Sequence, residues 1–304
     1  MKIDHILFAV DFSAYSRSLN SEVEWLSSHF DSRVTLLHVF EIPTSWYGEG
    51  EIPLICSEDI LAYSKSEKEL LDDYAIQIPE NRVQRISVEG GAAWHIADWV
   101  RNHDVDLVVI GTHGYGPFRR LMLGSVAMKV MHDASCPVWT HAMHSDGESR
   151  IAKIDRISNI VCAIDLTDEA VPLLRFTKEL AAYLGANVRL VHTLTGPDWL
   201  YKYFDLEKVA GEEISKIQTE AGTDFAVSLT KTHIAQNMTE VAFEQRADLI
   251  VVGRGKTQAT FGSLRTHAYE IIRRANCPVL SYSMDWHPHT SSASHQNKVP
   301  EPVA

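Results

Sequence analysis

The stretch VDLVVIGTHGYGPFRRLMLGSVA, residues 105–127, decides how we interpret the fold. It begins with an apolar run that has the length of a buried strand, and it ends in a helical pattern. Between them lies a loop with the spacing Gly-x2-Gly-x9-Gly-Ser, formed by Gly111, Gly114, Gly124 and Ser125. Glycines let the backbone approach a ligand closely, and the free N–H groups at a helix start suit phosphate oxygens. The stretch therefore predicts a strand, a phosphate-binding loop and a helix.

The chain repeats itself. Four segments recur in the same order: IDHILFAVDF (3–12) as ISNIVCAIDL (157–166), VTLLHV (34–39) as VRLVHT (188–193), VDLVVIG (105–111) as ADLIVVG (247–253), and SCPVWTHAM (135–143) as NCPVLSYSM (276–284). A chance match at four ordered positions is implausible, and the length of 304 residues suits two domains of about 150 residues each. We expect domains at 1–145 and 155–285 and a disordered tail at 286–304.

Short apolar runs alternate with helical patterns in each copy. In the first copy the periodicity predicts helices over 14–29, 57–75, 92–103 and 124–133, with Ser13 as the N-cap of the first. Strands that alternate with helices need crossover connections, and these produce a parallel sheet. The predicted fold class is therefore α/β, with two tandem, doubly wound, five-stranded, Rossmann-like domains.

The composition argues against several kinds of protein. The net charge of -12 disfavours binding to nucleic acid or to an anionic membrane, because both need clustered Lys and Arg. The apolar runs are too short to span a bilayer, and the N-terminus does not resemble a signal peptide. The four cysteines form no Cys-x2-Cys pair, so we interpret them as reduced thiols. We expect a cytoplasmic protein.

A ligand site is expected at the carboxyl ends of the strands, where the strand order of such a sheet reverses. Asp11 follows the first strand and the glycine loop follows the fourth. Asp11 has the chemistry to accept hydrogen bonds from a ribose or an adenine amino group, and Arg119 and Arg120 lie within the loop, where they could cover phosphates. Alternatively, Asp11 caps the first helix and the glycine loop is a plain turn.

The chain resembles the universal stress protein family in the motifs VDFS (10–13), LLHV (36–39), VIGTHG (109–114), LGSVA (123–127) and CPV (136–138). The resemblance covers nearly the whole chain and implies a tandem member of that family. ATP-binding members of the family carry the same glycine spacing, so the resemblance implies that the first domain binds ATP or another adenine nucleotide, with Mg²⁺ as a companion ion.

The resemblance also implies which residues contact the nucleotide. Asp11 and Val39 would contact the adenine side, and Ala9, Val10 and Ile110 would line the pocket. Ribose and phosphates would be held by Gly111, Gly114, Gly124, Ser125 and Val126. His113 lies inside the loop, close to where the phosphates would be, and His38 and His192 are expected to hold the loop after the fourth strand by a hydrogen bond.

The second copy departs from the nucleotide-binding pattern. Counted back from Cys277, the positions that match Gly124 and Ser125 are Arg265 and Thr266, and Gly262-Ser263 lies three residues too early. An arginine side chain would fill the phosphate cradle, so we predict that the second domain binds nucleotide weakly or not at all. By the resemblance, the strands after the two Cys-Pro pairs would pair within the chain to give a pseudo-dimer; a further homodimer stays open.

These features favour a nucleotide-binding regulatory protein of the stress response over an enzyme. The sequence has no evident Ser-His-Asp set, GxSxG motif or catalytic carboxylate pair. Two alternatives stay open: an interaction scaffold with a vestigial site, and slow ATP hydrolysis or autophosphorylation involving Ser125 and His113. The loop 43–55 is either a lid over the site or part of a structural insertion.

Overall fold

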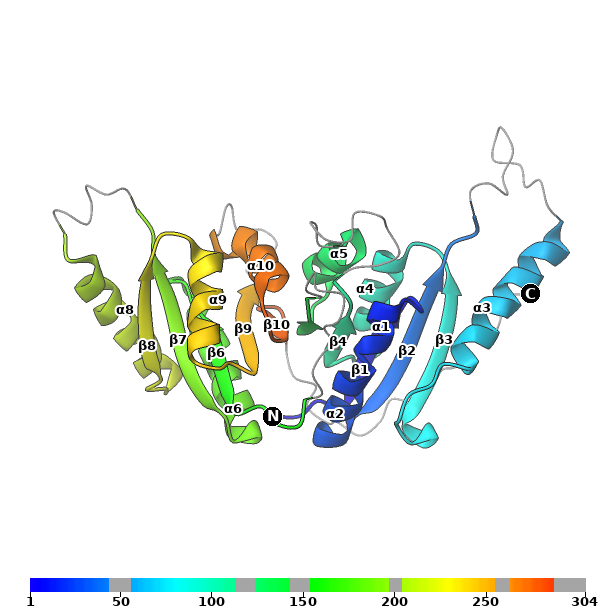
Figure 1. Ribbon diagram of the computed structural model, residues 1–304, viewed down its shortest axis with the longest axis horizontal. Coiled ribbons are helices and arrows are strands. Elements are labelled where there is room, and N and C mark those ends of the chain that lie inside the picture. The colour runs from blue at the N-terminus through cyan, green and yellow to red at the C-terminus, as the bar shows by residue number, and fades with distance from the viewer. Residues whose placement is uncertain (44–55, 113–123, 143–153, 197–203, 255–262, 287–304) are drawn as a thin grey trace.

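The computed structural model describes residues 1–43, 56–112, 124–142, 154–196, 204–254 and 263–286. Two halves of like topology lie side by side (Figure 1). The strands of the first half are β1 (His5–Val10), β2 (Arg33–Phe40), β3 (Val83–Glu89), β4 (Leu107–Ile110) and β5 (Val138–Thr140). Its helices are α1 (Ala14–Ser18), α2 (Asn20–Phe30), α3 (Ser57–Asp72), α4 (Ala92–Asn102) and α5 (Ser125–Asp133), with a 3-10 turn, η2 (Glu80–Arg82), before β3.

The second half repeats this order. Its strands are β6 (Asn159–Ala163), β7 (Asn187–Leu194), β8 (Ala226–Lys231), β9 (Leu249–Arg254) and β10 (Val279–Ser283). Its helices are α6 (Ala170–Leu184), α8 (Leu206–Ala221), α9 (Ile234–Glu244) and α10 (Ser263–Arg274). Within the described residues, we find no helix that combines the length and the apolar character needed to cross a membrane.

The described strands form one sheet in the order β3-β2-β1-β4-β5-β10-β9-β6-β7-β8. Within each half all pairings are parallel, and β1 pairs with β2 on one side and with β4 on the other. The strand order therefore reverses between β1 and β4, which leaves a crevice outside their carboxyl ends. The predicted α/β class with two five-stranded parallel halves is confirmed.

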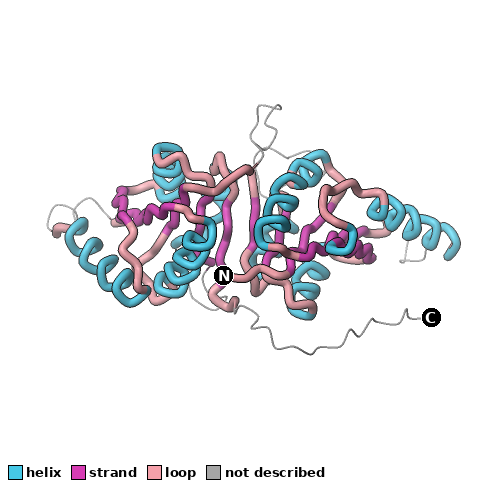
Figure 2. The backbone as a smooth tube through the Cα atoms, turned by 90° about the horizontal axis from the view of Figure 1, so that it is seen from below, coloured by secondary structure: helices cyan, strands magenta, loops and turns pink. Residues whose placement is uncertain are grey.

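The central strands are buried on both faces. Every residue of β4 is buried, and Val108 and Val109 are fully enclosed. Helices pack above and below the strands (Figure 2), so neither face of β4 meets water. Burial on both faces explains why this strand is a continuous apolar run rather than an alternating one.

The two halves are joined along β5 and β10, which pair antiparallel. The Thr140 hydroxyl donates to the carbonyl of Val279 at 3.2 Å, and the Ser281 hydroxyl donates to the carbonyl of Val138 at 3.2 Å. The strands after the two Cys-Pro pairs thus meet within one chain, as predicted. This junction, together with the helices beside it, is called the seam below.

Aromatic side chains close the seam on the face that carries α2 and α6. The rings of Phe30 and Tyr183 stack with centroids 4.8 Å apart, and the Tyr183 hydroxyl donates to the carbonyl of His29 at 2.9 Å. Trp286, where we set the start of the tail, is buried and packs edge-on against Phe176. The rest of the predicted tail lies outside the described residues.

The prediction of one helix over 14–29 was wrong, because the chain forms α1 and α2 with a break at Leu19. The Ser18 hydroxyl donates to the carbonyl of Tyr15 at 2.6 Å, and the N–H of Leu19 bonds to the carbonyl of Ser16, three residues back. A serine side chain that competes for main-chain carbonyls and a tight i to i+3 bond both interrupt α-helical geometry. The apolar periodicity continues through the break, which is why it was not predicted.

Candidate nucleotide-binding site

The predicted site residues of the first half converge on the carboxyl ends of β1 and β4. These strands are adjacent and parallel, with Ala9 opposite Ile110. Asp11 follows β1 directly, Gly111 follows β4 directly, and β2 brings Val39 to the same edge of the sheet. The strand order therefore assembles, at one crevice, residues that are far apart in the sequence.

The turn after β1 is organised by Asp11. Its Oδ1 accepts hydrogen bonds from the main-chain N–H of Ser13 at 3.0 Å and from the Ser13 hydroxyl at 2.7 Å. The Ser13 Oγ in turn accepts from the N–H of Ser16 at 3.0 Å, which confirms Ser13 as the N-cap of α1. Asp11 thus holds a turn, as the structural alternative expected. Both bonds use Oδ1, so Oδ2 is able to accept a hydrogen bond from a ligand.

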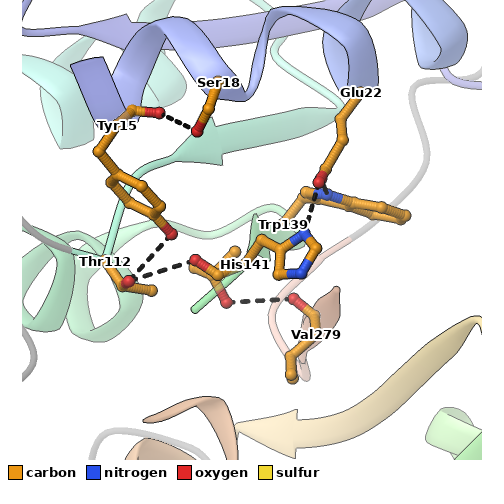
Figure 3. Close-up of polar contacts among 8 residues, drawn as sticks. Tyr15, Ser18, Glu22, Thr112, Trp139, His141 and Val279 are labelled. Carbon is orange, nitrogen blue, oxygen red and sulfur yellow. Dashed lines mark hydrogen bonds and ion pairs between the residues drawn. The ribbon is translucent and has the colours of Figure 1, made fainter. Parts of the chain in front are cut away.

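The loop after β4 is closed at its base. The N–H of Gly124 donates to the carbonyl of Thr112 at 2.7 Å, which brings the start of α5 against the end of β4. The Thr112 side chain is fully buried, and its hydroxyl donates to the carbonyl of His141 at 3.2 Å and accepts from the Tyr15 hydroxyl at 3.1 Å (Figure 3). Burial raises the pKa of Tyr15 above its usual range, so this hydroxyl stays a neutral donor. We did not predict Thr112 or Tyr15 as part of the site.

The start of α5 has the properties of an anion site. Its N-cap, Gly124, has extended backbone geometry and provides no side-chain cap. The first-turn N–H groups of a helix have no partner within the helix, so they and the helix dipole attract negative charge. Ser125 and Val126 in this turn are exposed. In contrast, the Ser13 side chain caps the start of α1.

The apolar residues predicted to line the pocket fall into two groups. Val10 and Ile110 are only 4% and 5% exposed, so their side chains belong to the core. Ala9 and Val39 are half-buried. A ligand in the crevice would therefore meet the side chains of Ala9 and Val39. His113 and Gly114 lie outside the described residues, as do Arg119, Arg120 and the loop 44–55.

His38 has a different structural role from the one predicted. Its Nδ1 donates to the carbonyl of Val10 at 2.8 Å, and its Nε2 lies 3.0 Å from Oε2 of Glu67 on α3. The ring also lies against Phe12, with centroids 4.2 Å apart. His38 thus ties the ends of β1 and β2 together, and the expectation that it holds the loop after the fourth strand was wrong. Glu67 and Phe12 gave no recognisable sequence signal.

A buried carboxylate lies behind the site. Glu22 on α2 is fully buried, and it accepts hydrogen bonds from Nε1 of Trp139 and from Nδ1 of His141, the latter at 2.5 Å (Figure 3). Thr112 bonds to the carbonyl of the same His141, and the neighbouring Thr140 bonds across the seam. A continuous chain of contacts therefore joins the base of the glycine loop to the seam.

Comparison with known proteins identifies the family. The model of the Universal stress protein family matches the chain twice, at residues 2–140 and at residues 156–282. The chain belongs to the universal stress protein family. "Universal stress protein A homolog 1" of Coxiella burnetii is 28% identical over 141 residues, which are 45% of this chain and 95% of that protein. That universal stress protein therefore has the length of one half of this chain.

Solved universal stress proteins share the architecture. One from Archaeoglobus fulgidus aligns over 93% of this chain and 99% of its own, with 18% identity and a TM-score of 0.65, which shows the same fold. Another from that organism, solved in complex with dAMP, is 29% identical and covers 41% of this chain and 97% of its own, with a TM-score of 0.33.

The second universal stress protein domain keeps the turn that follows the first strand of the first domain. His192 donates to the carbonyl of Ile164 at 3.0 Å, matching His38 and Val10, and Asp165 accepts from the Thr167 hydroxyl at 2.5 Å. This histidine too was expected to hold the loop after the fourth strand; its Nδ1 bonds to the end of the first strand, and residues 255–262 of that loop lie outside the described residues.

The helix after β9 starts earlier than its counterpart in the first domain. It begins at Ser263, three residues before Thr266, which matches Ser125. Three residues are about 4.5 Å of helix, so Arg265 and Thr266 lie within the first turn rather than at the helix start. In place of Thr112 stands Arg254, which donates across the seam to the carbonyls of Met131 and Cys136.

Proposed function

We propose that the first domain of this universal stress protein binds ATP and that the chain acts as a nucleotide-responsive regulatory protein in the cytoplasm. The observation that carries the proposal is the bond between Gly124 and Thr112. It sets an uncapped helix start beside the end of β4, one strand away from the Asp11 turn. A nucleotide needs both parts, an anion site and a polar acceptor, at one crevice.

Each residue has a proposed role. The first-turn N–H groups of α5 and the Ser125 hydroxyl bind phosphate oxygens, and Gly111 and Gly114 allow the backbone to approach them. Oδ2 of Asp11 accepts from the ribose or the adenine. Ala9 and Val39 contact the base, while Val10 and Ile110 support it from the core. We propose that Mg²⁺ accompanies the phosphates and that His113 lies near them. The dAMP complex belongs to the Archaeoglobus fulgidus protein; the support for ATP here is the geometry of this crevice.

Isothermal titration calorimetry with ATP tests the proposal on protein freed of carried-over nucleotide. We expect one site per chain with a micromolar dissociation constant, about -8 kcal/mol. Gly124→Arg should abolish the binding, because an arginine side chain at the N-cap of α5 would fill the space proposed for the phosphates. Gly211→Arg is the matched control, since it adds the same side chain at an open position of α8. If ATP, ADP and AMP all produce no heat, the site is vestigial and the interaction-scaffold alternative holds.

A slow phosphotransfer activity is the second candidate. The observation that favours it is the exposed Ser125 hydroxyl at the start of α5, where the terminal phosphate of ATP would lie. Incubation with radiolabelled ATP, with and without Mg²⁺, should then label the wild-type chain or release phosphate above the level seen with Gly124→Arg. Equal signals from the two proteins would leave nucleotide binding alone as the function.

A further inference from the structure

The turn after β1 contains a residue in an unusual backbone conformation. Phe12 has φ 60°, in the left-handed region that glycine adopts readily and that bulky residues adopt rarely. Among the described non-glycine residues with a positive φ, Phe12 is the only apolar one; the others carry polar side chains. Phe12 directly follows Asp11, the proposed acceptor of the ribose or the adenine, so its conformation affects that side chain.

The left-handed conformation allows a side-chain turn that fixes the Asp11 carboxylate. Its Oδ1 accepts from the main-chain N–H of Ser13 at 3.0 Å, so Phe12 lies between the two partners. A carboxylate that bonds to the N–H two residues on mimics a β-turn. Phe12 then takes the third position of that turn, which needs a positive φ in the type II form and is usually glycine. Asp11 is thus held through Oδ1, and Oδ2 is left to accept from a ligand.

Ring contacts offset the strain at Phe12. Its ring lies against His38, with centroids 4.2 Å apart, and near Tyr74, with centroids 6.1 Å apart. Both neighbours are fixed: His38 makes the two hydrogen bonds described above, and the Tyr74 hydroxyl donates to Oδ1 of Asn20 at 2.7 Å. Rings at these separations attract one another beyond the burial of their area. The aromatic contacts therefore hold the side chain in the position that the left-handed backbone gives it.

The matching turn of the second domain is held differently. Leu166 stands at the position of Phe12, and it is not among the described residues with a positive φ. Asp165 accepts from the Thr167 hydroxyl at 2.5 Å, and the contacts of the described residues include no bond to Asp165 from the N–H of Thr167. Leucine also has no ring to lay against His192. A rotatable side chain thus holds Asp165, whereas the main chain as well as a side chain holds Asp11.

We propose that Phe12 is a positioning residue for nucleotide binding by the first domain, an inference that rests on the proposed function. Its left-handed backbone, held by the ring contacts to His38 and Tyr74, sets the N–H of Ser13 against Oδ1 of Asp11. The carboxylate is thereby oriented before the ligand arrives. Such pre-organisation raises affinity, because binding no longer has to order the acceptor. Phe12 acts through Asp11 and needs no contact with the nucleotide.

Calorimetry with ATP compares two substitutions of Phe12 that differ in backbone freedom. Phe12→Leu keeps a β-carbon but has no ring, as in the second domain, and it should weaken ATP binding at least about tenfold, the value of one hydrogen bond to a charged group. Phe12→Gly also removes the ring but adopts the left-handed φ without strain, so it should lose less affinity than Phe12→Leu. Phe243→Leu on α9 is the matched control, because Phe243 is 77% exposed; it should leave the affinity unchanged.

A double-mutant cycle tests whether Phe12 acts through Asp11. In the Asp11→Ala background, Phe12→Leu should change the ATP affinity by less than about twofold, because the acceptor that Phe12 positions is already gone. An undiminished effect in that background would overturn the inference, and so would equal affinities of Phe12→Leu and Phe12→Gly.

Two further outcomes are separable. If Phe12→Leu fails to fold by circular dichroism, Phe12→Ala replaces it, because alanine keeps the β-carbon and has little side chain to pack. Wild-type protein that binds no ATP refutes the proposed function and this inference with it. Wild-type binding that Phe12→Leu leaves unchanged refutes the role of Phe12 alone.

Discussion

Replacing Glu22 tests whether the buried network behind the glycine loop stabilises the fold. Glu22 is fully buried and accepts hydrogen bonds from Trp139 and His141. In Glu22→Ala both donors lose their acceptor. Each unsatisfied buried donor costs about 1–3 kcal/mol. With two such donors, we therefore expect the free energy of unfolding to fall by about 2–6 kcal/mol.

Glu22→Gln separates the charge from the shape of the side chain. The amide keeps the volume and one oxygen acceptor, but its NH2 group faces the other donor. We expect a loss of about 2–3 kcal/mol, smaller than that of Glu22→Ala, because one hydrogen bond survives without its charge.

The assay is equilibrium unfolding in urea at pH 7, followed by far-ultraviolet circular dichroism and by tryptophan fluorescence. The matched control is Glu213→Gln on α8, an exposed carboxylate that pairs with Lys216 at 2.9 Å. This control should change the free energy of unfolding by less than about 0.5 kcal/mol. A loss below about 1 kcal/mol in Glu22→Ala would refute the reasoning, since it would mean that the two donors find other partners.

Two further predictions concern acid stability and backbone conformation. Burial lowers the pKa of His5 to about 4, so below pH 6.5 the unfolded chain binds a proton at this histidine and the folded chain does not. Between pH 6.5 and 4 the free energy of unfolding of the wild type should therefore fall by about 3 kcal/mol more than that of His5→Gln. Equal losses in the two proteins, measured by urea unfolding at each pH, would contradict this. Gly185 ends α6 with φ 66°, whereas Gly211 lies inside α8 with open space around it. Gly185→Ala should therefore destabilise the protein by about 1 kcal/mol, because alanine is strained in this left-handed conformation. Gly211→Ala should stabilise the protein by about 0.5–1 kcal/mol. Equal thermal midpoints for the two variants would refute these backbone conformations.

Most of the architecture was predictable because it depends on local pattern. Buried strands such as β4 and β9 are continuous apolar runs, and the order of strand and helix segments fixes the parallel topology. That topology also brought Asp11 and Gly111 to one crevice, since parallel neighbours end at the same edge. The N-cap at Ser13 followed from residue type alone.

What could not be predicted depends on contacts between distant residues. Glu22 has the sequence context of a solvated helix position, and its partners lie 117 and 119 residues away. Glu67 reaches His38 from α3, in a segment where the two copies share no sequence motif, although α8 takes the matching place in the second half. The early start of α10 was hidden because the glycine positions were matched by counting from Cys277, and such counting assumes that helix ends coincide.

The seam between β5 and β10 has a genetic consequence. In a two-fold dimer of identical chains, each codon specifies both sides of the interface, so one substitution alters both subunits together. Here the two sides are encoded separately. Arg254 can therefore donate to the carbonyl of Cys136 in the neighbouring domain, while Thr112, at the matching position of the first domain, still accepts a hydrogen bond from the N–H of Gly124. Joining the copies in one gene lets one domain acquire a new contact while the other keeps the residue at the matching position.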